Sequence, residues 1–134
     1  MLKVVLDTNV VLRCISRRSA FAAVFEKLFD GKFELCISNE ILLEYEEKIS
    51  TIFSKDTAEL FVGALTTLPN AKKIDVYYQL QLISTDNDDN KFVDCAFTGN
   101  VHYLVTNDKH FNTLKSVAFP IINVIKLEEF AELI

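Results

Sequence analysis

Short apolar runs alternate along the chain with longer segments of helical periodicity. Residues 4–7 form an aliphatic run that ends in an aspartate and lacks alternation, which is typical of a strand covered on both faces. Similar runs predict strands at residues 33–37, 103–106 and 121–125, and apolar spacings of three and four predict helices at residues 19–30, 38–53, 54–68, 89–98 and 127–134. Strands that alternate with helices in this way predict an α/β fold, in which a mostly parallel sheet carries helices on both faces.

One segment, residues 72–81, fits two patterns. Apolar residues at positions 74, 76 and 78 alternate as in a strand, whereas those at positions 77, 80 and 83 have the spacing of a helix. Residues 84–90 follow as a run of acids, amides and hydroxyls, which predicts a polar loop. The pattern alone leaves the strand and the helix open for this segment.

The composition is that of one globular domain over residues 1–134, with 50% hydrophobic and 25% charged residues. No apolar run has the length of a membrane span and the N-terminus lacks a signal pattern, so we expect a cytoplasmic protein without membrane association. Cys14, Cys36 and Cys95 are far apart, which favours buried, reduced thiols. The net charge of −5 disfavours a broad nucleic-acid-binding surface but is compatible with a pocket of acids that holds divalent cations.

Four acids occupy positions where a parallel sheet brings distant residues together. Asp7 ends the first strand, Asp108 follows a later strand, and Asp89 stands at a helix N-terminus. Glu44 lies about 60° round its helix from Ile41, at the edge of the buried face. Ligands of open α/β sheets bind beyond the carboxyl ends of the strands, so these acids are candidates for one site. Two simpler interpretations stay open: Asp7 as a helix cap, and Glu44 as part of a solvated face.

Clustered carboxylates repel one another and are tolerated mainly where a cation neutralises them. Oxygen ligands without cysteine or histidine select Mg²⁺ or Mn²⁺, which activate water and stabilise charge on a phosphodiester oxygen. His102 and His110 lack the spacing of metal ligands, and we interpret both as ordinary polar residues. The acids therefore predict a carboxylate site for one of these two ions.

Four short motifs resemble those of the PIN domain family, and especially those of the bacterial VapC-type ribonuclease toxins and their relatives. The motifs are Val5-Leu6-Asp7-Thr8-Asn9, residues 38–44, Asp89-Asn90-Lys91-Phe92 with Ala96, and residues 104–108 with Phe111. They occur in the family's order and spacing over essentially the whole chain. The resemblance implies a three-layer α/β/α fold, Mg²⁺- or Mn²⁺-dependent cleavage of RNA, frequent homodimerisation and, in many relatives, a small antitoxin partner.

The resemblance also implies roles for individual residues. Asp7 would be the central metal ligand, and Asp89 and Asp108 would complete the metal shell. Glu44 would act through a bound water or a second ion. The supporting polar residues would be Thr8, Asn9 and Thr106.

The third metal ligand requires a choice between Asp89 and Asp94. Asp89 stands at a helix N-terminus, where free backbone N–H groups stabilise an ionised carboxylate. Asp94 lies about 7.5 Å further along the helix and about 140° round it, so the two side chains do not easily reach one cation. We therefore predict that Asp89 is the ligand and that Asp94 is a supporting or helix-surface carboxylate.

Two further classes of function stay open. Haloacid-dehalogenase phosphatases also begin with a strand that ends in aspartate, but they need a second aspartate where this chain has Asn9. A PIN-like interaction module without catalysis is disfavoured by the intact acids at all four positions. For a regulated nuclease we expect a small inhibitor that places an arginine or lysine in the acidic pocket, because arginine pairs bidentately with carboxylates.

Overall fold

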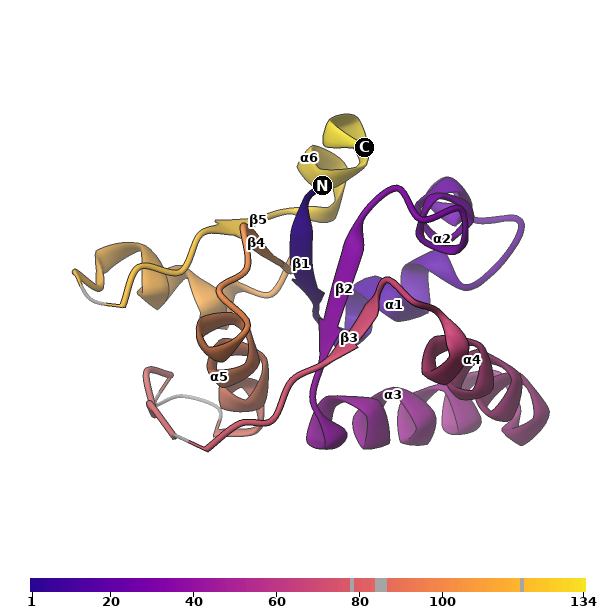
Figure 1. The fold of residues 1–134 in the computed structure, drawn as a ribbon, viewed down its shortest axis with the longest axis horizontal. Helices are drawn as coiled ribbons and strands as arrows, with labels where there is room; N and C mark the ends of the chain where they lie inside the picture. Colours follow the sequence, from indigo (N-terminus) through magenta and orange to yellow (C-terminus); the bar gives the residue numbers. More distant parts are fainter. Residues whose placement is uncertain (78, 84–86, 119) are drawn as a thin grey trace.

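The computed structural model describes residues 1–77, 79–83, 87–118 and 120–134. Its centre is a sheet of five parallel strands in the order β3-β2-β1-β4-β5 (Figure 1). The strands are β1 (Lys3–Leu6), β2 (Glu34–Ile37), β3 (Ala71–Lys73), β4 (Tyr103–Val105) and β5 (Val124–Ile125). This is the α/β architecture that the alternating pattern predicts.

The first strand, β1, is the middle of the sheet. Val4, Val5 and Leu6 are each 0% exposed, because β2 and β4 flank the strand and helices cover it. The chain passes outward from β1 through β2 to β3, and it then crosses back to β4 and β5 on the other side. The strand order therefore reverses between β1 and β4, and such a switch point is where open α/β sheets form their binding crevice.

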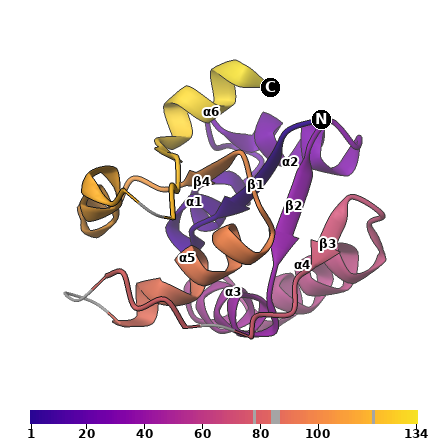
Figure 2. The same cartoon turned by 60° about the vertical axis from the view of Figure 1, so that its left-hand side comes forward.

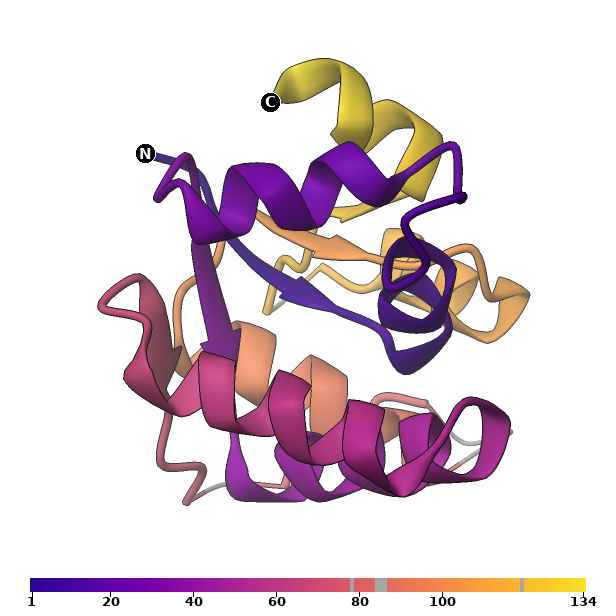
Figure 3. The ribbon, with the colours of Figure 1, turned by 90° about the vertical axis from the view of Figure 1, so that its right-hand side faces the viewer.

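Helices lie on both faces of this sheet and form its outer layers. The helices are α1 (Thr8–Cys14), α2 (Ala22–Phe29), α3 (Asn39–Ile52), α4 (Lys55–Thr67), α5 (Asn90–Thr98) and α6 (Leu127–Leu133), with 3₁₀ segments η1 (Asn87–Asp89) and η2 (Lys109–Ser116). Figures 1 and 3 show α2 and α4 on one side of the sheet and α5 on the other. In Figure 2, α5 lies across β1 and β4, which it contacts. The three-layer α/β/α prediction is confirmed.

The sequence places several local features correctly. Ser38 and Ser54 cap α3 and α4, each accepting a hydrogen bond from a backbone N–H three residues on. The three cysteines are buried and free. Within the described part of the chain, no helix is both long and apolar enough to cross a membrane.

The ambiguous segment at residues 72–81 becomes strand only over β3, and the helix alternative is wrong for the described residues that follow. Leu80 donates its backbone N–H to Asp94 Oδ1 over 3.0 Å, and Asn90 bonds both backbone groups of Ile83. Side chains of α5 thus take the place of a strand or helix partner for this backbone. The predicted strand at residues 121–125 shortens to β5, and the predicted polar loop at residues 84–90 lies in part, at residues 84–86, outside the described residues.

Candidate metal centre

Asp7 lies at the switch point of the sheet. Its backbone N–H donates to the carbonyl of Val105 over 3.0 Å, which extends the pairing of β1 with β4 by one position. The residue is 5% exposed, and its side chain accepts no N-capping hydrogen bond from the backbone N–H groups that follow Thr8 in α1. The helix-cap interpretation of Asp7 therefore does not explain why a carboxylate is buried here.

Thr106 connects the ends of the two central strands. Its hydroxyl donates to Asp7 Oδ2 over 2.7 Å and accepts the backbone N–H of Asp108 over 3.0 Å. One buried hydroxyl thus fixes the side chain of the first aspartate and the backbone of the other. The supporting role that the family resemblance implies for Thr106 is compatible with this geometry and stays a prediction.

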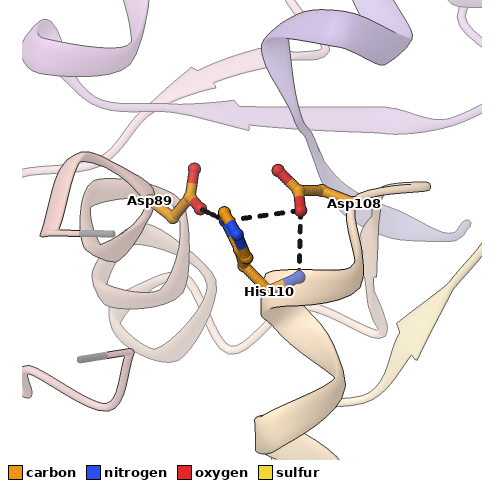
Figure 4. Close-up of side chains that lie close together, drawn as sticks. All are labelled: Asp89, Asp108 and His110. Atoms are coloured by element: carbon orange, nitrogen blue, oxygen red, sulfur yellow. Dashed lines mark hydrogen bonds and ion pairs between the residues drawn. The ribbon is translucent and has the colours of Figure 1, made fainter. Parts of the chain in front are cut away.

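Asp89 and Asp108 approach each other from different elements. Asp89 is the residue before α5, and Asp108 is the residue before η2, where its Oδ1 accepts the backbone N–H of His110 over 2.9 Å. Figure 4 shows the His110 ring between the two carboxylates. Its Nδ1 lies 3.2 Å from Asp89 Oδ2 and 3.5 Å from Asp108 Oδ1.

The pKa of Asp7 reflects its burial and its acidic neighbours. Burial raises the pKa of Asp7 from 3.8 to about 6, and the negative charges of Asp89 and Asp108 act in the same direction. Hydrogen bonds from the Thr106 hydroxyl and the Thr8 backbone lower the pKa but do not offset the burial. A carboxylate with a pKa near 6 in a group of acids is a functional-site candidate, and a nearby cation would restore its full ionisation.

Glu44 reaches the same edge of the sheet but has partners of its own. The neighbouring Tyr45 is fully buried and donates its hydroxyl to the carbonyl of Leu6, which anchors α3 beside the end of β1. Glu44 accepts the hydroxyl hydrogen of Thr8 and forms an ion pair with Lys91, whose Nζ lies 2.8 Å from Oε1. Glu44 is therefore not part of a wholly solvated helix face, since its side chain is only 19% exposed.

The other two predicted supporting residues lie differently. Asn9 is exposed on the first turn of α1. Asp94 is buried, and together with Glu40 it lines a cleft of about 470 Å³ beside the segment that contains Leu80. Burial raises the pKa of Asp94, the Leu80 N–H lowers it, and Glu40 raises it. Asp94 thus supports the chain before α5, which agrees with the choice of Asp89 over Asp94; that choice stays a prediction.

Two functional candidates were missed in the sequence. His110 is not an ordinary polar residue, because its ring contacts two predicted metal ligands; the available signal was its place two residues after Asp108. Lys91 forms its ion pair with a residue 47 positions earlier, and nothing in the local pattern indicates this contact. Both residues are in or next to the motifs that carry the family resemblance.

The group of side chains fits a small divalent cation. Among the described residues, Asp89, Asp108 and His110 offer ligand atoms that all lie within 4.8 Å of one another. Asp7 stands beside this group, close enough for both aspartates to raise its pKa. Carboxylate oxygens with at most one imidazole suit Mg²⁺, Mn²⁺ and related first-row ions.

A parallel α/β/α fold with acids gathered at its switch point defines the class of protein. A family model described as PIN domain matches residues 3–110. Because this match covers most of the chain, the protein belongs to the PIN domain family. Family membership leaves the haloacid-dehalogenase alternative without support.

Solved structures show the same fold. The chain is similar to the structure of VapBC2 from Rickettsia felis bound to a DNA fragment from their promoter, with 19% identity, a TM-score of 0.63 and coverage of 93% of this chain and 98% of that chain. The chain is also similar to VapBC-1 from nontypeable Haemophilus influenzae, with 15% identity, a TM-score of 0.63 and coverage of 95% of this chain and 99% of that chain. Similarity to the PIN domain endonuclease Utp24 has 18% identity, a TM-score of 0.55 and coverage of 92% of this chain and 84% of that chain. No curated protein matches the chain.

Proposed function

We propose that this protein is a metal-dependent endoribonuclease that hydrolyses RNA phosphodiester bonds and serves as the toxin of a toxin–antitoxin pair. The observation that carries the proposal is the buried carboxylate of Asp7, whose pKa of about 6 reflects burial beside Asp89 and Asp108. Keeping such a group in the folded protein is costly unless a cation binds there. Similarity to VapBC structures and to a PIN domain endonuclease supports the same choice of chemistry.

In this proposal Asp7, Asp89 and Asp108 hold the Mg²⁺ or Mn²⁺ ion. When bound, such an ion activates a water molecule and stabilises negative charge on the phosphate. The protein itself supplies position: the Thr106 hydroxyl holds Asp7 by a 2.7 Å hydrogen bond and keeps the Asp108 backbone in place. Glu44, held by Lys91 and Thr8, borders the site and would orient a water rather than bind the ion directly.

The test is cleavage of a fluorescently labelled single-stranded RNA by the purified protein with Mg²⁺ or Mn²⁺, and with EDTA as the metal-free control. We expect metal-dependent cleavage by the wild type, loss of cleavage in Asp108→Asn, and normal cleavage by Asp75→Asn, which alters an exposed aspartate. A folded wild-type protein that binds the ion but leaves every RNA intact contradicts the proposal. That outcome would favour the non-catalytic interaction module.

The proposal includes partners. The VapBC structures from Rickettsia felis and Haemophilus influenzae to which this chain is similar support a small antitoxin that binds this chain. A basic antitoxin side chain in the pocket would pair with the same carboxylates that bind the ion, and would so inhibit the enzyme. A homodimer, and a location in the cytoplasm together with its RNA substrate, belong to the same proposal.

A further inference from the structure

We propose that His110 is a ligand of the divalent cation, so that the site combines carboxylates with one imidazole and prefers transition-metal ions over Mg²⁺. The inference rests on the metal site of the proposed function and specifies its chemistry. It replaces the oxygen-only ligand set that the sequence suggests. The probe ion is Mn²⁺.

The distances around His110 are those expected of neighbouring ligands. Nδ1 lies 3.2 Å from Asp89 Oδ2 and 3.5 Å from Asp108 Oδ1. Adjacent ligand atoms in an octahedral shell are separated by about 1.4 times the metal–ligand distance, or about 3 Å for ions with ligands near 2.1 Å. Three atoms this close therefore need only small side-chain movements to share one ion.

The ring is also held in a position that an ion can reach. The backbone N–H of His110 donates to Asp108 Oδ1 over 2.9 Å, so the first turn of η2 sets the histidine against the carboxylate. The side chain of His110 is 46% exposed, whereas those of Asp108 and Asp89 are 28% and 13% exposed. The imidazole, which lies between the two carboxylates in Figure 4, is therefore the most solvent-exposed of the three side chains.

Ligand chemistry then predicts the ion preference. Imidazole nitrogen binds first-row transition ions well, while Mg²⁺ favours oxygen ligands and retains its waters. A site with His110 in its shell should consequently discriminate against Mg²⁺ more than a site made of carboxylates alone. The alternative is that the His110 ring only hydrogen-bonds to Asp89 until a cation displaces it.

The chain provides a matched control, because it contains two histidines. His102 is exposed, and its Nδ1 accepts the backbone N–H of Lys3 over 3.0 Å at the other end of the sheet. It contacts the start of β1, whereas Asp7 lies beyond the end of that strand. A change at His102 should not alter metal binding.

The experiment uses the full chain without a histidine tag and records electron spin-echo envelope modulation of bound Mn²⁺. The wild type and His102→Gln should show the modulation of a directly bound imidazole ¹⁴N, and His110→Gln should lack it. In calorimetric titrations, His110→Gln should weaken Mn²⁺ binding about tenfold or more and change Mg²⁺ binding less than about threefold.

Two results overturn the inference without touching the proposed nuclease. In one, Mn²⁺ binds the wild-type protein in a manner that depends on Asp108, but its spectrum shows no imidazole modulation. In the other, the His110→Gln variant binds Mn²⁺ as tightly as the wild type, as expected if the cation displaces His110 rather than binding it. Failure of the proposed function itself is measured separately in the RNA cleavage assay: a wild type that shows the imidazole modulation with Mn²⁺ but leaves every RNA intact would contradict the nuclease and keep His110 as a ligand.

Discussion

Replacing Asp7 by asparagine should stabilise the metal-free protein while it destroys the metal site. The residue is 5% exposed, and its pKa of about 6 lies well above the usual 3.8. Asparagine keeps the shape and retains an oxygen that can accept the 2.7 Å hydrogen bond from Thr106. It removes the charge that burial and two neighbouring acids disfavour.

The magnitude follows from proton linkage. In the folded protein Asp7 keeps its proton up to a pH of about 6, whereas the unfolded chain loses it near 3.8. The folded state therefore loses stability as the pH rises through this window, and the loss is complete above it. At about 1.4 kcal/mol for each pKa unit, the raised pKa of Asp7 lowers the free energy of unfolding by about 3 kcal/mol at pH 7.5 and by about 1 kcal/mol at pH 4.5.

The assay is urea unfolding in EDTA at these two pH values. Asp7→Asn should raise the free energy of unfolding by up to about 3 kcal/mol at pH 7.5, and by clearly less at pH 4.5. Asp75→Asn, at an exposed site, should leave both values within about 0.5 kcal/mol of the wild type. An Asp7→Asn protein that is no more stable than the wild type at pH 7.5, or whose gain does not depend on pH, would show that burial does not raise the pKa of Asp7 in this way.

Other predictions concern the residues around Asp7. Thr106→Val removes both hydrogen bonds of the hydroxyl and should weaken Mn²⁺ binding by about 10- to 100-fold in calorimetry. Thr106→Ser keeps a hydroxyl and should retain most of the wild-type affinity. Equal losses of affinity in the two variants would contradict the positioning role of Thr106. A double-mutant cycle of Lys91→Met and Glu44→Gln, measured as free energies of unfolding, should give a coupling energy of about 1 kcal/mol or more for the Lys91–Glu44 ion pair. A coupling energy near zero would show that neither side chain depends on the other. An antitoxin recovered with the chain from its source cell should bind the triple Asn variant of Asp7, Asp89 and Asp108 much more weakly than the wild type at low salt, with a smaller difference at high salt, and undiminished binding argues against a basic side chain in the pocket.

The sequence predicts the framework because the framework depends on local signals. An unbroken aliphatic run such as residues 4–6 favours a strand that is buried on both faces. Once the strands are parallel, residues that follow them must meet at one edge, so the proximity of Asp7 and Asp108 follows from topology. Helix starts at Ser38 and Ser54 are equally local.

The features that the sequence does not predict depend on contacts across the fold. The described residues after β3, 74–77 and 79–83, form no helix or strand, and Asn90 and Asp94 of α5 bond the backbone of Leu80 and Ile83 instead. His110 is a candidate ligand because its ring contacts Asp89, which lies 21 positions earlier in the sequence. The two side chains meet only after α5 and η2 pack beside each other. Such pairings have no periodicity, and they appear only when the side chains are placed in space.

The most direct test of the central claim is a crystal structure with Mn²⁺, in which anomalous scattering locates the ion. We expect an anomalous peak bounded by carboxylate oxygens of Asp7, Asp89 and Asp108, beyond the ends of β1 and β4, and no such peak in crystals of Asp108→Asn. A peak in the cleft of Asp94 and Glu40 instead, or no bound ion in crystals soaked at millimolar Mn²⁺, would contradict it.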